Sequence, residues 1–341
     1  MSILITGGMG YIGSHTVKYF LDKNEDVIVV DNLQGGHSKS INVDYFYQID
    51  LRDKMALDQV FKKHNIEAVI HFAANSLVGE SMEKPHDYYH NNVYGMLCLL
   101  DIMKKNNVVK IVFSSTAATY GEPKNIPILE EDETNPANPY GETKLAMEKM
   151  MKWFEKGYGT KYVSLRYFNA AGAHKNGEIG EDHNPETHLI PLILQVPLGL
   201  REKIYIFGDD YPTKDGTCIR DYIHVMDLAS AHYQALEYLR NDNSSNIFNL
   251  GNGNGHSVIE VINMARKVTN HPIPAEVKGR RMGDPAVLIA SSEKAKNVLG
   301  WNPMFDSLER IITDAWNWHK NHPKGYSNEP NKNLSLRSWK D

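Results

Sequence analysis

The first 31 residues constrain the fold of this chain more than any other stretch. A strand-like apolar run, 2–6, leads directly into the glycine-rich turn Gly7-x-x-Gly10-x-x-Gly13 and then into a helical stretch. Such a turn lets backbone amides and a helix N-terminus approach a pyrophosphate. A second apolar run, 26–31, ends in Asp31, where an acid in this order binds an adenine-ribose diol. We therefore predict a dinucleotide-binding domain, and the free carboxylate favours NAD over NADP.

Strand-like and helical stretches alternate through the next hundred residues. The strand-like runs lie at 45–48, 68–73 and 110–115, and the helical stretches at 14–21, 55–64 and about 87–105. This alternation predicts an α/β fold, a doubly wound parallel sheet of Rossmann type with a smaller C-terminal substrate-binding domain. We expect the NAD-binding domain at 1–170, a mainly substrate-binding domain at 171–326 with some strands returning to the first domain, and a flexible tail at 327–341.

Polar and small residues follow the predicted strands at their carboxyl ends, where ligands bind in such sheets. These candidates for the cofactor side are Asp50, Phe72-Ala73-Ala74, Asn91 and Ser114-Ser115-Thr116. Asp50 is suited either to accept from an adenine amino group or to act as a solvated turn acid, and the sequence favours neither. His71 is predicted to pack at its strand end, because no second His or Cys lies at metal-binding spacing from it.

The pair Tyr140 and Lys144 is a candidate for acid–base chemistry. Asn138 and Pro139 predict a helix start, because Asn caps free N–H groups and Pro fits the first helical position. Tyr140 and Lys144 then lie on one helix face, where a nearby cation favours the phenolate. Such a pair is common by chance. With Thr116 at the mouth of the sheet, Thr116 and Tyr140 are predicted to grip a substrate hydroxyl while Lys144 orients the cofactor ribose.

Composition limits the partners of this 341-residue chain. The net charge is −5 and basic residues are scattered, so we expect no nucleic-acid partner. No apolar run reaches about 18 residues, so no membrane segment is expected. Cys98 and Cys218 are the only cysteines, which fits inert core thiols, the reducing cytoplasm and the absence of a Cys-rich metal site. We predict no metal centre.

Taken together, the motifs resemble those of a known family. The glycine-rich turn, Asp31, His71-Phe72-Ala73-Ala74, Ser114-Ser115-Thr116 and Tyr140-x-x-x-Lys144 are similar to the motifs of the extended short-chain dehydrogenase/reductase family. The similarity to the UDP-hexose epimerases of that family covers nearly the whole chain. It continues at 166–174, 206–213, 220–225 and 249–251, runs as far as Trp318 and closes with 322–326.

This resemblance implies an NAD-dependent isomerase that inverts C4 of UDP-hexoses, interconverting UDP-glucose and UDP-galactose in galactose metabolism. It implies that NAD stays tightly bound, takes a hydride from C4 and returns it to the other face of a 4-keto sugar that has rotated. The implied catalytic residues are Tyr140, Lys144 and Thr116. Relatives are mostly homodimers, and the helical stretch 87–105 is our candidate for the dimer face.

The resemblance also implies binding roles for individual residues. The implied cofactor-binding residues are Gly7, Gly10, Tyr11, Ile12, Gly13, Asp31, Asn32, Asp50, Leu51, Phe72, Ala73, Ala74, Asn91, Ser114, Tyr140, Lys144 and Tyr167. The implied substrate-binding residues are Thr116, Tyr140, Asn169, His188, Leu189, Tyr205, Phe207, Arg220, Arg281, Asp284 and Leu288. Among these, Arg220 and Arg281 match diphosphate positions and Asp284 matches a ribose position. Asn169 matches a second diphosphate contact, and the strand from Tyr205 is expected to face uracil.

Several positions depart from the best-known pattern of the family. Thr116 replaces a frequent serine and preserves its hydroxyl. Ser76 stands where some relatives carry lysine, His188 where some carry asparagine, and Gly35-Gly36 is expected to loosen the adenosine contacts. Leu288 occupies the position that gates sugar size, where tyrosine excludes and cysteine or serine admits N-acetylated hexoses. Leucine is intermediate and favours some tolerance of UDP-N-acetylhexosamines.

Four alternative functions compete with this interpretation. A UDP-N-acetylglucosamine 4-epimerase stays open because of Leu288. A UDP-glucuronate-type epimerase or decarboxylase needs a pocket cation for the C5 carboxylate, and the sequence leaves it open but disfavoured. A nucleotide-sugar 4,6-dehydratase needs an acid pair directly after the strand-end threonine, where this chain has Ala117-Ala118. A non-catalytic NAD-binding sensor has no need of Tyr140 and Lys144 beside a hydroxyl.

Overall fold

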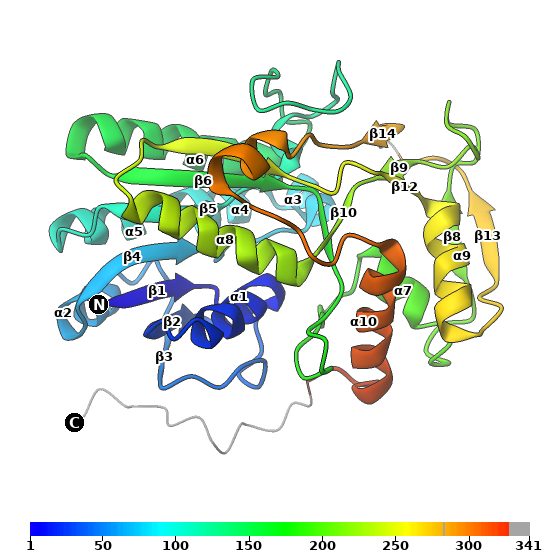
Figure 1. The fold of residues 1–341 in the computed structure, drawn as a ribbon, viewed down its shortest axis with the longest axis horizontal. Helices are drawn as coiled ribbons and strands as arrows, with labels where there is room; N and C mark the ends of the chain where they lie inside the picture. The colour runs from blue at the N-terminus through cyan, green and yellow to red at the C-terminus, as the bar shows by residue number, and fades with distance from the viewer. Residues whose placement is uncertain (282–283, 327–341) are drawn as a thin grey trace.

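The computed structural model describes residues 1–281 and 284–326, and Figure 1 shows their arrangement. The strands are β1 Ser2–Thr6, β2 Val27–Asp31, β3 Tyr45–Gln48, β4 Ile66–His71, β5 Lys110–Ser114, β6 Lys161–Tyr167, β7 Asn169–Ala171, β8 Ile204–Phe207, β9 Ile219–Arg220, β10 Tyr222–His224, β11 Asn246–Leu250, β12 His256–Ser257, β13 Ala275–Lys278 and β14 Val287–Leu288. The helices are α1 Tyr11–Asp22, α2 Lys54–Lys63, α3 Val78–Glu83, α4 Pro85–Tyr88, α5 Gly95–Lys105, α6 Pro139–Tyr158, α7 Leu189–Leu194, α8 Val225–Arg240, α9 Val258–Thr269 and α10 Leu308–Asn321. Three short turns of other helical types are η1 Tyr89–Tyr94, η2 Ala117–Thr119 and η3 Ala295–Leu299.

Seven parallel strands form the central sheet in the order β11-β6-β5-β4-β1-β2-β3. The order reverses between β1 and β4, and the carboxyl ends of strands at such a reversal are where ligands bind. β11 comes from the second half of the chain and completes the sheet beside β6. The predicted fold class, a doubly wound parallel sheet with a smaller C-terminal unit, is confirmed.

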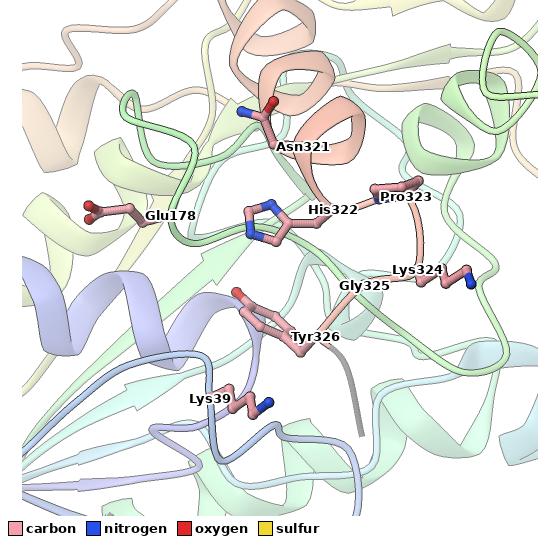
Figure 2. A pocket seen from close by; sticks show the side chains of 8 residues that line it. All are labelled: Lys39, Glu178, Asn321, His322, Pro323, Lys324, Gly325 and Tyr326. Carbon is pink, nitrogen blue, oxygen red and sulfur yellow. The ribbon is translucent and has the colours of Figure 1, made fainter. Parts of the chain in front are cut away.

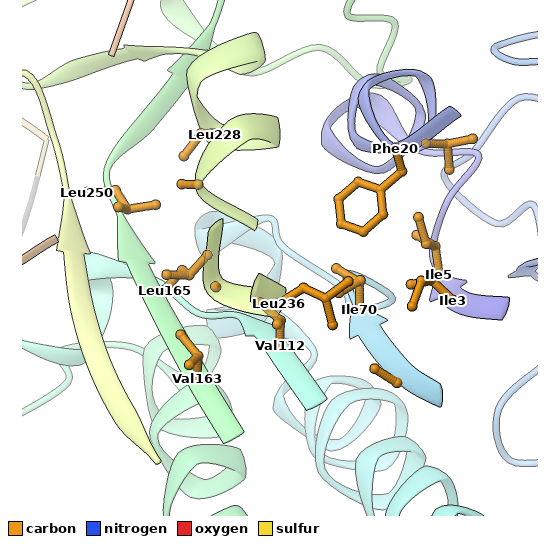
Figure 3. Packing of buried hydrophobic residues seen from close by; sticks show 14 of the residues in the cluster. Ile3, Ile5, Phe20, Ile70, Val112, Val163, Leu165, Leu228, Leu236 and Leu250 are labelled. Carbon is orange, nitrogen blue, oxygen red and sulfur yellow. The ribbon is translucent and has the colours of Figure 1, made fainter. Parts of the chain in front are cut away.

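Two apolar cores form because the side chains of each strand alternate between the two faces of the sheet. In β1, Ile3 and Ile5 belong to the core under α1 and α8, whereas Leu4 belongs to the core under α2, α5 and α6. Figure 3 shows Phe20 of α1 and Leu236 of α8 directed towards the first of these faces. The helices are thereby fixed over the sheet, and with them the turns that begin each helix.

A third core belongs to the smaller unit. Helices α7, α9 and α10 pack around β8 through apolar side chains that include Ile193, Ile206, Val261 and Ile311. This unit lies beyond the carboxyl ends of the sheet strands, as Figure 1 shows. The turns that follow the strands therefore face the smaller unit.

The helix predicted at 87–105 consists of three successive segments, α4, η1 and α5, of which η1 is π-helical. Asn92 lies buried in η1, where its Oδ1 accepts from the Asn75 amide at 2.8 Å and its Nδ2 donates to Thr143 Oγ1 at 3.1 Å. The wide turn thus directs one amide side chain at both the loop after β4 and helix α6. Helix α7 ends at Leu194, shortly before Pro197, which disfavours the helical conformation of the residue that precedes it.

The two cysteines, Cys98 and Cys218, are both buried and neither forms a disulfide. In the described ranges, no helix is long and apolar enough to cross a membrane. His71 is buried at the end of β4, stacks on Phe113 and hydrogen-bonds Thr6 through Nδ1 at 2.7 Å. Burial lowers its pKa to about 3, so His71 packs as a neutral ring, as predicted.

Phe20 is fully buried between α1 and the sheet. We expect Phe20→Ala to lower the free energy of unfolding by about 3–5 kcal/mol, because it removes an aromatic ring and leaves a cavity. Urea unfolding followed by circular dichroism measures this change. Trp153→Ala on α6, where the side chain is 67% exposed, is the matched control and should change stability by less than about 0.5 kcal/mol. Equal losses in both variants would contradict this assignment of the core.

Candidate active site

The glycine-rich turn is held tightly against the loop that follows β4. Gly7 has a left-handed backbone, φ +72°, and an added Cβ would lie 2.5 Å from the Ala73 amide nitrogen. At Gly13 an added Cβ would lie 2.1 Å from the Gly7 carbonyl oxygen. The packing of the protein itself therefore requires both glycines. The same packing brings Phe72 and Ala73, which are predicted to line the cofactor, next to the N-terminus of α1.

Gly10 has no such constraint, and it tests whether the turn fits a dinucleotide. Its φ is −77°, and an added Cβ would meet only the Gly7 carbonyl oxygen, at 3.5 Å. Helix α1 has no side-chain cap and no acid in its first turn, so the N–H groups of Tyr11 and Ile12 are available to an anion. An uncrowded glycine before an uncapped helix fits the phosphates of NAD, which Gly10, Tyr11 and Ile12 would hold.

Asp31 at the end of β2 is fixed by the backbone around it. Its Oδ2 accepts from the Met9 amide at 3.0 Å and its Oδ1 from the Leu33 amide at 2.8 Å. Burial raises the pKa of this carboxyl, and the two amides oppose that rise. An added Cβ at Gly36 would lie 3.1 Å from Asp31 Oδ2 and 2.9 Å from the Met9 carbonyl carbon. At Gly36 the missing side chain therefore permits close packing against Met9 and Asp31. Its effect on the adenosine contacts stays a prediction.

Asp50 is held by charged and polar neighbours. Arg52 donates from Nε to Oδ1 at 2.7 Å and from Nη2 to Oδ2 at 2.5 Å, and Asn32 donates to Oδ2 at 3.1 Å. The hydrogen bonds from Arg52 hold the pKa of the Asp50 carboxyl well below its usual range. Asp50 is therefore a fixed carboxylate rather than a freely solvated turn acid, with Leu51 buried beside it. Its contact with adenine stays a prediction.

Predicted catalytic and cofactor residues meet where β5 ends. Lys144 is buried on α6, donates from Nζ to the Ser114 carbonyl at 2.8 Å and lies 6.0 Å from the centre of the Tyr140 ring. The Ser114 hydroxyl hydrogen-bonds the Tyr167 hydroxyl. The predicted helix start is confirmed, because the Asn138 side chain caps the first turn of α6. The spacing of four residues thus places phenol and amine on the helix face that meets the strand end.

The protonation of this pair differs from the expectation that Lys144 lowers the pKa of Tyr140. Burial raises the pKa of the Tyr140 phenol, and a hydrogen bond with the Thr116 hydroxyl opposes that rise. Burial also lowers the pKa of the Lys144 amine to about 7, although Glu148 acts to raise it. Lys144 therefore carries only part of a positive charge near neutral pH. In the protein alone, both groups are shifted towards their neutral forms.

A buried ion pair behind this site was not anticipated from the sequence. Glu148 lies one helical turn after Lys144 and pairs with Arg166 of β6, Oε2 to Nη2 at 2.6 Å, with both side chains 4% exposed. The Ser115 hydroxyl donates to Glu148 Oε1 at 2.5 Å, which connects the pair to the end of β5. The sequence feature that could have indicated the pair is Glu148 itself. It is an acid four residues after Lys144 and therefore lies on the same, buried face of the helix.

Two of the predicted diphosphate residues lie beside the predicted ribose residue, Asp284. Arg220 Nη2 lies 3.4 Å from Asp284 Oδ1, and Arg281 Nε lies 2.9 Å from Oδ2. The Arg281 guanidinium also lies over the ring of Phe207, 4.9 Å from its centre. Two guanidinium groups, a carboxylate and an aromatic face form a set that can bind a nucleoside diphosphate.

Leu288, the predicted gate for sugar size, connects these arginines with the end of β5. In β14 it pairs with Arg220 of β9. Its side chain packs with Phe168 against a buried cluster that includes Ala117, the residue after Thr116. The gate therefore lies between the predicted diphosphate contacts and the predicted catalytic hydroxyl.

The remaining predicted substrate-binding residues lie on β7, on β8 and at the start of α7. Asn169 begins β7 and its Nδ2 donates to the Asp221 carbonyl at 3.2 Å. Tyr205 lies on β8, and Leu189 begins α7. His188 precedes α7, and its ring faces Glu186 at 3.1 Å. The His188 side chain is nevertheless 44% exposed, and its contact with a substrate stays a prediction.

Two surface cavities do not coincide with the gathered residues. Figure 2 shows a cavity of about 460 Å³ between the end of α10 and the turn at 322–326, with Lys39 and Glu178 at its edge. None of the predicted site residues lines it. A second cavity of about 220 Å³ includes Asn91, whose Nδ2 donates to Asn92 Oδ1 at 3.1 Å. The convergence of side chains, rather than cavity size, identifies the candidate site.

Comparison with known proteins gives a family and close relatives. Residues 3–251 match the family described as the NAD dependent epimerase/dehydratase family. The UDP-glucose 4-epimerase of Halalkalibacterium halodurans is 64% identical over 329 residues, which cover 96% of this chain and 98% of that protein.

Solved structures agree with this similarity. A crystal structure of UDP-glucose 4-epimerase superposes with a TM-score of 0.94 at 61% identity, covering 96% of this chain and 100% of that one. The UDP-glucose 4-epimerase from Bifidobacterium longum, in complex with NAD+ and UDP, has a TM-score of 0.91 at 41% identity, with coverage of 96% and 100%.

The buried Lys144 amine predicts a pH-dependent stability. Its pKa of about 7 in the folded chain is below the ordinary value of 10.5, so between these values the unfolded chain binds more protons. The stability of the nucleotide-free protein relative to Lys144→Met should therefore be lowest below about pH 7 and rise towards about pH 10. Melting temperatures of both proteins across this range measure the effect. Lys149→Met, an exposed position on the same helix, is the control and should show no such trend; a pH-independent difference for Lys144→Met would refute the prediction.

Proposed function

The chain belongs to the NAD dependent epimerase/dehydratase family, and on this basis we propose that it inverts C4 of UDP-hexoses and so interconverts UDP-glucose and UDP-galactose. The motif resemblance to the extended short-chain dehydrogenase/reductase family is confirmed by these relatives. The main observation that supports this function is that Thr116, Tyr140 and Lys144 lie close together at the end of β5. Directly after Thr116 come Ala117 and Ala118. Tyr140 can act as a base for the 4-hydroxyl, but the two alanines cannot act as an acid and a base at C5 and C6. The site therefore supports redox chemistry at C4 rather than loss of water.

The proton steps belong to the chain's own residues. NAD, when bound, would supply the redox chemistry, which is reversible hydride transfer at C4 of the sugar. Tyr140 as phenolate accepts the proton of the 4-hydroxyl while C4 becomes a ketone, and it returns a proton to the same oxygen when C4 is reduced. Tyr140 ends each turnover in its starting state, and nothing is consumed.

Thr116 and Lys144 control the proton affinity of Tyr140. Thr116 opposes the effect of burial through its hydrogen bond to the phenol. Lys144, with Nζ 6.0 Å from the centre of the Tyr140 ring, favours the phenolate whenever it is protonated. Because the pKa of Lys144 is lowered to about 7 by burial, both of its charge states are accessible at neutral pH. We propose that the charges of Tyr140 and Lys144 adjust together during turnover.

The nucleotide and the hexose are held in different ways. Arg220 and Arg281 supply cations for the diphosphate, and Asp284, which pairs with both, is an acceptor for the ribose diol. Around the hexose position, Leu288 and Phe168 offer apolar surface with no hydrogen-bonding side-chain groups. A firm grip on UDP and a weak grip on the sugar allow the 4-keto sugar to turn before it is reduced.

We propose three further properties of the chain. UDP-N-acetylhexosamines are additional substrates if Leu288 leaves room for the acetamido group. The chain forms a homodimer through α4, η1 and α5, where Tyr89, Tyr94 and Leu97 are exposed apolar residues. It acts in the cytoplasm, in keeping with two free thiols.

The alternatives differ from this proposal in what they require of the site. A non-catalytic NAD-binding sensor has no use for a buried lysine beside a tyrosine and a threonine hydroxyl. A UDP-glucuronate-type enzyme needs a cation for the C5 carboxylate, whereas Arg220 and Arg281 gather at Asp284. Both alternatives are therefore less well supported than C4 epimerisation.

Tyr140→Phe tests the proposed base. It removes the only oxygen of the side chain, and we expect turnover of UDP-galactose to fall by about 10²–10⁴-fold, the usual contribution of a general acid–base group. Purified protein is incubated with UDP-galactose without added NAD, and the sugars formed are separated by chromatography. Tyr158→Phe, an exposed tyrosine on the same helix, is the matched control and should retain full turnover. Undiminished turnover in Tyr140→Phe would sink the mechanism.

Leu288→Tyr tests the proposed gate. A larger side chain beside Phe168 should exclude the acetamido group, and we expect kcat/KM for UDP-N-acetylgalactosamine to fall at least about tenfold relative to that for UDP-galactose. Both substrates are assayed separately in the wild type and the variant. Leu288→Met keeps the volume and serves as the control. If the ratio of the two kcat/KM values is the same in all three proteins, Leu288 is not the gate.

A further inference from the structure

Four side chains between β7 and α7 form a compact group that takes no part in the proposed proton and hydride transfers. They are Glu181, His183, Glu186 and His188, and each offers one ligand atom such that all four atoms lie within 4.8 Å of one another. We propose that this group binds one divalent transition-metal ion, with Zn²⁺ as the preferred ion. The inference does not rest on the proposed epimerase function, because it concerns residues outside the reacting centre.

The spacing of the donor atoms matches a tetrahedral zinc site. Bonds of about 2.0–2.2 Å from Zn²⁺ to imidazole nitrogen and carboxylate oxygen place neighbouring donors about 3.3–3.6 Å apart. His188 Nδ1 lies 3.0 Å from Glu181 Oε1 and 3.1 Å from Glu186 Oε1. His183 Nδ1 lies 3.3 Å from Glu181 Oε1 and 3.7 Å from Glu186 Oε2. These four histidine–glutamate distances therefore lie close to the tetrahedral spacing, and all the donor atoms lie within 4.8 Å of one another.

Hydrogen bonds within this group leave the Nδ1 atoms of the two histidines incompletely paired. His188 Nδ1 faces a carboxylate oxygen of Glu181 and another of Glu186 at nearly equal distances, but it carries at most one hydrogen. His183 Nδ1 is buried and forms no hydrogen bond within the described part of the chain. A cation at the centre would engage both nitrogens and both carboxylates at once.

The charges also favour a divalent cation. The Glu181 and Glu186 side chains are only 5% and 8% exposed, and within the described ranges no lysine or arginine pairs with either. Buried carboxylates require compensating positive charge, which one M²⁺ ion supplies while both imidazoles stay neutral. Two imidazole nitrogens with two carboxylate oxygens suit Zn²⁺, whereas Mg²⁺ and Ca²⁺ prefer sites built from oxygen alone.

The position of the group indicates a structural role. Four protein donors leave no open coordination position, which is typical of structural rather than catalytic zinc. His188 directly precedes α7, and the ring of His183 meets the ring of Tyr11 edge-on, 6.2 Å between centres. A metal ion here would fix the segment that leads from β7 into α7 and that contacts Tyr11 at the start of α1. Its removal should therefore weaken the fit of nucleotide-sugar and raise KM more than it lowers kcat.

The sequence pattern Glu181-x-His183-x-x-Glu186-x-His188 contains the signal for this site. The expectation that the chain has no metal centre rests on the two cysteines and on the surroundings of His71. These two arguments do not concern the histidines and glutamates of the loop before α7. Their four side chains become neighbours only because the loop folds back on itself.

Metal content of the wild-type protein is the first test. Untagged protein is incubated with ZnCl₂, dialysed against metal-free buffer and analysed by plasma mass spectrometry. We expect one retained zinc ion per chain. X-ray absorption at the zinc edge should then show nitrogen and oxygen ligands and no sulfur, which excludes Cys98 and Cys218 as the ligands. Failure to retain stoichiometric zinc, or sulfur ligation, would overturn the proposal without the need for any variant.

Substitutions then assign the ligands. His183→Gln and Glu186→Gln each remove one donor of this group. The side-chain amide introduced by Glu186→Gln still offers an acceptor to the backbone amides of Thr187 and His188, which the Glu186 carboxylate serves in the wild type. We expect each variant to lose zinc affinity at least about tenfold, since even indirect changes around metal ligands cost that much. Zinc should protect the wild type, and not these variants, against thermal unfolding.

His86→Gln is the matched control, because His86 and His90 are an exposed stacked pair that could collect zinc by chance. This variant should bind zinc like the wild type. Zinc binding that is lost in His86→Gln and retained in His183→Gln and Glu186→Gln would place the ion at the surface pair and overturn the proposal.

Discussion

The buried ion pair between Glu148 and Arg166 fixes the groups that act at the end of β5. The pair is bidentate, with Arg166 Nε 3.0 Å from Oε1 and Nη2 2.6 Å from Oε2, and both side chains are almost completely buried. Removing one partner would leave a buried charge uncompensated, at a cost of about 3–5 kcal/mol. Because Glu148 and Lys144 are one turn apart on α6, the pair also sets the rotation of the helix that presents Tyr140 and Lys144 to the strand ends. The register between α6 and β6 thus determines the geometry of the site.

Burial is the second constraint, and it acts in opposite directions on the two groups of the site. Loss of water raises the pKa of Tyr140 and lowers that of Lys144 to about 7, so both groups move towards neutrality. A neutral phenol is a poor base. The positively charged nicotinamide ring of bound NAD would favour the phenolate, so we expect Tyr140 to be a stronger base when the cofactor is bound. This dependence suits an enzyme in which a premature proton transfer would have no productive outcome.

Features that depend on near neighbours in the chain were predictable, and features that depend on distant partners were not. The glycine-rich turn, the capped start of α6 and the alternation of strands and helices are local, and the structure has them where the sequence predicts them. Glu148 of α6 pairs with Arg166 of β6, and this contact depends on β6 lying beside β5 in the sheet. The close approach of Gly36 to Asp31 and Met9 likewise depends on how the loop after β2 folds back. The pKa of Lys144 depends on how deeply α6 packs, which no spacing reveals.

Contacts between the two units explain how the sugar can move while its surroundings stay fixed. The Tyr11 hydroxyl donates to the Gly172 carbonyl at 2.7 Å, and a ring nitrogen of His15 lies 3.1 Å from the Ile179 carbonyl. His37 makes a further contact of 2.8 Å with the Asp182 carbonyl. Separating the units would leave these buried or partly buried groups without partners, at about 1–3 kcal/mol for each. An enzyme that restores its cofactor in every turnover has no need of that opening, because the motion that the reaction requires is confined to the hexose.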